Sequence, residues 1–149
     1  MERVVNDLDD RVGNEGLELC TGGLATIPPK IYADNRAMAA WFRDNQIDLS
    51  ADYARNRWAL MTKKLVLREM PDRRWDELKP ADIKNRLKED SSELEVMERG
   101  VYRYYLLNKD SKPPLLFAFE TGAGDQGVLE ITGFTQKPRS VKLRYKLVQ

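Results

Sequence analysis

Three glycines in the second half of the chain have the spacing of a nucleotide-binding loop. Gly122, Gly124 and Gly127 form a literal G-x-G-x-x-G after a predicted strand. In dinucleotide-binding proteins such glycines open a helix whose N-terminal amides hold the pyrophosphate. Here residues 128–132 have the pattern of a strand, and Asp125 would place a negative charge where a phosphate should lie. The pattern therefore predicts a hairpin loop and no cofactor.

Basic residues alternate along the last predicted strand. Lys142, Arg144 and Lys146 should point to one face of that strand. Such a stripe could contact an acidic protein surface, anionic lipid or nucleic acid. The alternative is a solvated sheet face whose charges pair across strands, with Glu130 as one partner. The alternative is favoured because nucleic-acid-binding sheets usually place aromatic residues among the basic ones, whereas Tyr145 falls on the apolar side.

Aromatic residues offer a second kind of candidate site. Tyr102 and Tyr104 flank Arg103 and, if exposed, could stack on a base or line a ligand groove. Residues of this kind more often flank the core of a sheet. A small-ligand pocket between the helices and the sheet would also use Trp41 and Trp58. The candidate partner-binding residues are therefore of two kinds. They are the charged residues Glu130, Lys142, Arg144 and Lys146 and the aromatic residues Tyr102 and Tyr104.

Two features of the composition exclude much catalytic chemistry. The 149 residues include no His, which excludes Ser-His-Asp and Cys-His catalysis and His-ligated zinc or haem. The single cysteine, Cys20, excludes an intramolecular disulfide and iron–sulfur clusters, and its place in an alternating stretch predicts burial. We therefore expect a non-enzymatic protein without catalytic residues, cofactor or metal. Acid–base chemistry by a pair of carboxylates stays open, because 24 acidic residues offer many pairings.

Length and charge fit one domain without a polyanionic partner. A chain of this size can bury a core without disulfides. Its 25 Lys and Arg residues nearly balance 24 Asp and Glu residues, so the overall charge indicates no such partner. No apolar stretch is long enough for a membrane helix, and the N-terminus lacks the pattern of a secretory signal. We expect a soluble, cytoplasmic chain without membrane insertion unless an upstream anchor precedes it.

The first part of the chain combines a polar start with short elements of both kinds. Residues 1–14 are acidic and polar, which predicts a flexible tail or linker, or else an edge strand. The domain itself should span 15–149. The elements expected next are a hairpin over 17–27 that turns at Gly22–Gly23, a helix over 35–45 capped by Asp34, a strand over 58–70 and a helix over 80–89.

From residue 94 onward the pattern is strongly that of β-structure. The expected strands are 94–97, 101–107, 115–121, 128–134 and 141–148. The spacers between them are shorter than the crossovers that parallel strands need, so neighbouring strands should be antiparallel. The predicted class is α+β: an antiparallel β-meander with one or two helices packed on one face.

The end of the chain resembles a family of uncharacterised bacterial C-terminal domains. Residues 127–135 and 138–149 carry the resemblance, because the family ending reads approximately GxLQIxGFTxxPxGVKIRYKLVQ. Glu130 replaces the usual Gln and Ser140 replaces a Gly. The hairpin over 17–29 is similar to the family's FDLxTGxLxTPP segment.

The resemblance implies an accessory domain. Domains of this family follow membrane-anchored or signalling modules, so the linker-like start would be the junction to an upstream region. The implied function is a C-terminal sensor or protein–protein interaction module, and no catalytic residues come with it. We therefore expect a non-enzymatic binding domain with a protein partner. The alternatives are a small-ligand pocket between helices and sheet, and nucleic-acid binding through the C-terminal basic strand.

Overall fold

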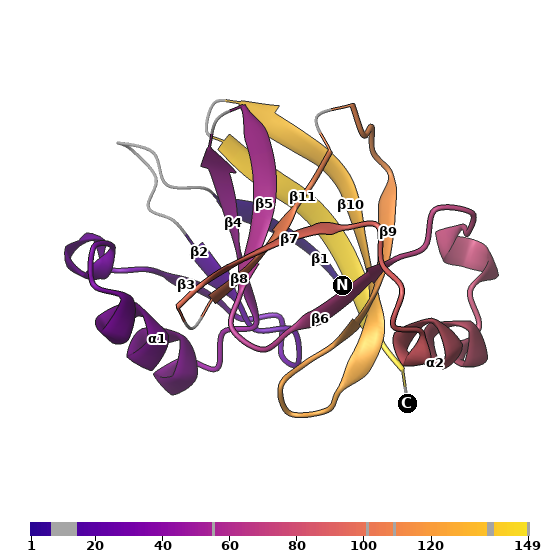
Figure 1. Ribbon diagram of the computed structural model, residues 1–149, viewed down its shortest axis with the longest axis horizontal. Coiled ribbons are helices and arrows are strands. Elements are labelled where there is room, and N and C mark those ends of the chain that lie inside the picture. Colours follow the sequence, from indigo (N-terminus) through magenta and orange to yellow (C-terminus); the bar gives the residue numbers. More distant parts are fainter. Residues whose placement is uncertain (7–14, 55, 101, 109, 137–138, 149) are drawn as a thin grey trace.

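Two antiparallel β-sheets lie face to face in the computed structural model, and one helix covers the outer face of each (Figure 1). The structure describes residues 1–6, 15–54, 56–100, 102–108, 110–136 and 139–148. The class is α+β and rich in strands, as predicted. A single meander is not confirmed, because the strands divide between two sheets, and the helices lie on opposite outer faces instead of one.

Sheet A has five strands in the order β1-β11-β10-β9-β6. Their bounds are β1 Glu2–Asn6, β6 Val66–Glu69, β9 Leu115–Glu120, β10 Gln126–Gln136 and β11 Arg139–Leu147. The last three strands are antiparallel neighbours along the chain, which is the part of the predicted meander that the structure contains. β1 pairs with β11 at the edge of sheet A, so residues 2–6 form the edge strand that was the alternative to a flexible tail. Residues 7–14 lie outside the described residues.

Sheet B has six strands in the order β3-β2-β4-β5-β8-β7. Their bounds are β2 Glu15–Leu17, β3 Leu24–Thr26, β4 Leu49–Ala54, β5 Arg57–Thr62, β7 Glu95–Arg99 and β8 Tyr102–Leu106. The single strand expected over 58–70 is wrong: it is two strands, β5 and β6, in different sheets. The chain crosses between the sheets at residues 63–65, where Lys63 and Lys64 interrupt the apolar run.

The main core fills the space between the two sheets. Leu60 of β5, Leu67 of β6 and Phe119 of β9 are fully buried there. Trp58 stacks on Phe134 across the same space, with ring centroids 5.4 Å apart. Burying each such side chain contributes about 1.5–3 kcal/mol. The two sheets are therefore held together by their inner apolar faces.

Helix α1, Asn35–Asp44, covers the outer face of sheet B and confirms the predicted helix. The Asp34 carboxylate accepts hydrogen bonds from the backbone N–H groups of residues 36 and 37, so it caps the helix as expected. Met38 and Phe42 are buried against the sheet. After the helix, Gln46 has a φ of 56°, a backbone conformation that favours glycine.

Helix α2, Pro80–Lys88, covers part of the outer face of sheet A and confirms the second predicted helix. Ile83 is its buried residue, and it packs in one cluster with Ala118 and Val128 of the sheet. A short 3-10 helix, η2 (Trp75–Glu77), leads into it. In the part of the chain that the structure describes, no helix is long and apolar enough to cross a membrane.

Candidate functional site

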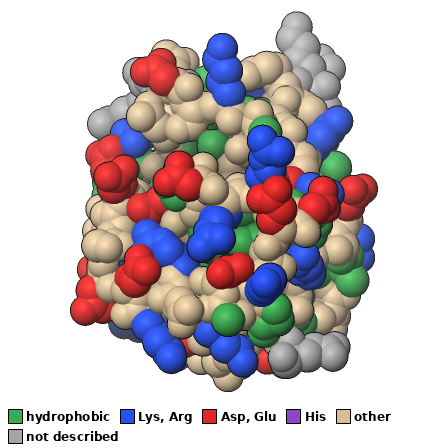
Figure 2. Space-filling view, turned by 90° about the vertical axis from the view of Figure 1, so that its right-hand side faces the viewer, with side chains coloured by type: hydrophobic (Ala, Val, Ile, Leu, Met, Phe, Trp, Pro, Cys, Tyr) green, Lys and Arg blue, Asp and Glu red, His purple; other side chains and the backbone are tan. Residues whose placement is uncertain are grey.

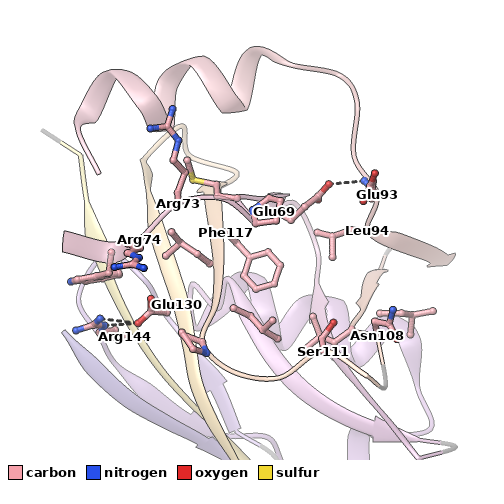
Figure 3. A pocket seen from close by; sticks show the side chains of 18 of the residues that line it. Glu69, Arg73, Arg74, Glu93, Leu94, Asn108, Ser111, Phe117, Glu130 and Arg144 are labelled. Carbon is pink, nitrogen blue, oxygen red and sulfur yellow. Dashed lines mark hydrogen bonds and ion pairs between the residues drawn. The ribbon is translucent and has the colours of Figure 1, made fainter. Parts of the chain in front are cut away.

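A cleft of about 690 Å³ opens where β6 and β9 of sheet A meet the ends of β7 and β8 of sheet B (Figure 3). Its walls come from the loop after β6, the residues that begin β7, the end of β8 with the loop that follows, and the first residues of β9. Glu130 of β10 and Arg144 of β11 also line it. Two of the candidate residues predicted from the sequence therefore belong to this cleft.

The floor of this cleft is apolar. The Phe117 ring lies at the centre of the view in Figure 3, with Leu94 on the β7 side. Leu115 of β9 packs in the same cluster as Phe117, whereas Leu116 lies on the opposite face of the strand, in the cluster beneath α2. A floor of this kind suits the hydrophobic body of a ligand, because covering it removes apolar surface from water.

Glu130 and Arg144 face each other across neighbouring strands. Their backbones are directly paired in the β10–β11 register, and Glu130 Oε1 lies 2.9 Å from Arg144 Nε and 2.8 Å from Nη2. Glu130 is only 6% exposed. A buried carboxylate is costly without a partner, so the guanidinium stabilises it at this position. This is the cross-strand pairing that was the alternative interpretation of the basic stripe.

Trp75 lies beside the same pair. Arg144 Cζ lies 4.4 Å from the centre of the Trp75 ring, and Lys146 Nζ lies 4.6 Å from it. Cations over an indole face are attracted by its electrons, so two residues of the basic stripe are held against η2. The third, Lys142, is exposed on the same face of β11 and does not line the cleft. The predicted alternation of β11 is confirmed.

Glu69 fixes the opposite wall. Its carboxylate accepts hydrogen bonds from the backbone N–H of Glu93 at 2.6 Å and from the Ser92 hydroxyl at 2.8 Å. The Arg86 guanidinium of α2 lies 3.3 Å away. Burial alone would raise the pKa of Glu69, but these partners together lower it. Glu69 therefore ties the end of β6 to the segment that leads into β7.

Charged groups of both signs surround the mouth. Arg57 pairs with Glu95 at 2.6 Å and donates to the carbonyl of Leu107 at 2.7 Å. The guanidinium of Arg74 and the carboxylate of Glu93 are exposed, and neither group has a hydrogen bond or ion pair within the described residues. Figure 3 places Arg74 near Arg144 at one side and Glu93 at the other. The cleft can therefore offer a cation at one end and an acceptor at the other.

Tyr102 and Tyr104 lie on the outer face of sheet B, in the cluster beneath α1 and away from this cleft. Tyr102 is buried, donates to the carbonyl of Asn35 at 3.2 Å and does not offer a binding surface. Burial raises its pKa to about 12. Trp58 belongs to the core between the sheets, so the expected shared pocket with Trp41 is wrong. The two tryptophans pack on opposite faces of sheet B.

The glycine-rich loop is the predicted hairpin, between β9 and β10. Gly124 has a φ of 97°, which suits glycine in a tight turn.

Cys20 is exposed, so its predicted burial is wrong. β2 ends at Leu17, and Cys20 lies in the turn that follows. No group of three or more His, Cys, Asp or Glu side chains that could hold a metal occurs among the described residues.

A smaller cleft of about 430 Å³ lies beside the β9–β10 hairpin. Asp48 lines it and accepts a hydrogen bond from the backbone N–H of Leu19 at 2.7 Å. Burial, together with the nearby carboxylates of Glu18 and Asp125, raises the pKa of Asp48 to about 6. Neither Asp48 nor Glu69 lies in a motif that marks it as a site residue, because the neighbours of both carboxylates come from distant segments of the chain.

The chain was compared with protein-family models, curated proteins and solved structures, and none of them matches it. The resemblance of its C-terminal segment to a bacterial domain family therefore stays a prediction.

Proposed function

We propose that this chain is a non-enzymatic binding domain that holds a small amphipathic ligand in the cleft between the sheets. The observation that carries the proposal is a cleft of about 690 Å³ with an apolar floor and walls fixed by hydrogen-bonded carboxylates. Ligand-binding clefts typically have volumes of about 300–1,000 Å³ and a few placed polar groups. This cleft is not the pocket between helices and sheet of the small-ligand alternative, because it lies where the two sheets meet and other residues line it.

The charges at the mouth suggest the polarity of the ligand. An anionic group, such as a carboxylate or sulfonate, would lie near Arg74 and the Trp75 side of the cleft. Its hydrophobic body would cover Phe117 and Leu94. A hydrogen-bond donor at its other end would meet Glu93 and Asn108.

Anilinonaphthalene sulfonate, which joins an aromatic body to an anion, is a suitable fluorescent probe for this site. Leu94→Trp should fill the cleft and abolish the fluorescence increase, and Arg74→Gln should weaken binding about fivefold or more. Arg36→Gln is the matched control, because Arg36 is exposed on α1 at the far side of sheet B. Equal binding by all four proteins, wild type included, would contradict the proposal.

Docking of an acidic protein surface on β11 is the second candidate. Lys142, Arg144 and Lys146 share the outer face of sheet A, and Lys142 and Lys146 are exposed. On the α2 side of the molecule, acidic and basic side chains are interspersed and form no single-sign patch (Figure 2). This mixture favours a protein over nucleic acid as the partner of the stripe, because phosphate backbones require concentrated positive charge.

A further inference from the structure

β7 is an edge of sheet B. Its five residues, Glu95–Arg99, pair with β8 on one side, and no other described strand pairs with them. Four of the five are exposed, including Val96 at 43%. An edge strand presents backbone N–H and C=O groups that can pair with another chain. β7 therefore has the backbone groups for strand addition.

At the β6 edge of sheet A, side chains bond to backbone groups that could otherwise pair with another strand. The Tyr105 hydroxyl donates to the carbonyl of Leu65 at 2.9 Å and accepts from the N–H of Leu67 at 3.2 Å. Arg86 donates to the carbonyl of Glu69 at 2.8 Å. Side chains thus occupy backbone groups along β6. No side-chain bond of this kind is found on the backbone of β7 among the described residues.

We propose that β7 pairs antiparallel with β7 of a second copy of this chain, around a two-fold axis at Met97. In that register Glu95 of one copy lies opposite Arg99 of the other, and this happens twice because of the symmetry. Moving one copy by a single residue would either place Glu95 opposite Glu98 or leave Glu95 beyond the last paired residue. Charge therefore selects one register.

Charges within each protomer extend the same pairing. Arg57 lies 2.6 Å from Glu95. At the other end of β7, Arg99 interacts with Asp52 and partly offsets the rise in the pKa of Asp52 that burial causes. Across the dimer, the charges of Arg57 and Glu95 of one copy would be followed by those of Arg99 and Asp52 of the second copy. Opposite charges thus alternate on each side of the axis, and Met97 meets its own copy at the centre.

The two-fold axis gives a specific test, because a residue on the axis faces its own copy. The wild-type protein should dimerise in analytical ultracentrifugation over a concentration series. Met97→Lys and Met97→Glu should each weaken the dimer about tenfold or more, because like charges would then face each other. An equimolar mixture of these two variants should form a heterodimer. Lys84→Glu is the control, because Lys84 is exposed on α2 and away from β7, and this variant should dimerise like the wild type.

Cross-linking tests the register without charge changes. In a Cys20→Ser background, Met97→Cys should oxidise to a covalent dimer, whereas Val96→Cys should not, because it would face Glu98. Circular dichroism melts would verify that each variant folds. A wild-type monomer at every concentration, a dimer insensitive to both Met97 charge variants, or equal cross-linking at 96 and 97 would overturn the proposal. These readouts are independent of probe binding in the cleft.

Discussion

The guanidinium of Arg144 holds the carboxylate of Glu130 at 2.8 Å across two neighbouring strands, where only 6% of Glu130 is exposed. Lys142, on the same face of β11, is exposed and has no ion pair among the described residues. The basic stripe predicted from the sequence therefore combines a structural residue, Arg144, with Lys142, whose charge is available to a partner, while Lys146 lies over the Trp75 ring.

The first prediction separates these two roles. Arg144→Gln should lower the free energy of unfolding by about 1–3 kcal/mol, because it leaves the buried Glu130 carboxylate without its cation. Lys142→Gln should change it by less than about 0.5 kcal/mol. Urea denaturation at neutral pH measures both. Adding Glu130→Gln to the Arg144 variant should recover part of the loss. Equal effects of Arg144→Gln and Lys142→Gln on the free energy of unfolding would show that the Glu130–Arg144 pair contributes little.

The second prediction concerns the Tyr105 hydroxyl, which links β8 of sheet B to the edge of β6 in sheet A. Tyr105→Phe should cost about 1–3 kcal/mol, because the carbonyl of Leu65 and the N–H of Leu67 lose their partner in the core. The N–H of Leu67 should also exchange faster with solvent. Tyr104→Phe is the control, since no hydrogen bond of its hydroxyl is found among the described residues. A Tyr105 variant as stable as this control would contradict the role.

The third prediction is a pH dependence caused by Asp48. Its folded-state pKa of about 6 lies above the ordinary 3.8, so its ionisation is disfavoured in the folded protein. The stability it contributes is fully present below its ordinary pKa and is lost as the pH rises through 6. Asp48→Asn keeps an acceptor for the Leu19 N–H and should stabilise the protein by roughly 1–2 kcal/mol at pH 7, after allowance for solvent screening.

Stability curves across this pH range test the assignment. The advantage of Asp48→Asn should shrink toward zero as the pH falls to about 4, because the wild-type carboxyl is then protonated in the folded protein. Asp90→Asn is a matched control at an exposed position and should follow the wild type. An Asp48 variant whose advantage is independent of pH would refute the raised pKa.

Local determinants explain which elements the sequence predicts well. Asp34 caps α1 from the preceding residue, and Met38 and Phe42 are four residues apart on one helix face. The helix can therefore be predicted from a short segment of the sequence. The β9–β10 hairpin is equally local. β4 is not predicted from the sequence because its inward positions include the small Ala51 between polar neighbours. This hydrophobic alternation is weak, and only burial between the sheets stabilises the strand.

The site is less predictable because topology assembles it. Glu130 and Arg144 were candidate partners since they lie on adjacent predicted strands. Glu69 and Leu94 join them only because the chain changes sheets after β5 and returns to sheet B at β7, and no motif signals that crossing. A charge stripe is visible in a single strand, whereas a cleft between two sheets requires the order of all the strands.

The last prediction tests whether Glu69 shapes the cleft. Glu69→Gln exchanges one acceptor oxygen for a donor, so it cannot satisfy the N–H of Glu93, the Ser92 hydroxyl and Arg86 together. Residues 92–94 should then exchange amide hydrogens faster, and the affinity for anilinonaphthalene sulfonate should fall severalfold. Glu89→Gln removes the other carboxylate partner of Arg86 but lies outside this cleft, so it should leave the affinity unchanged. If both variants bind the probe like the wild type, the Glu69 wall does not shape the site; if both weaken it, the effect comes from Arg86 and α2.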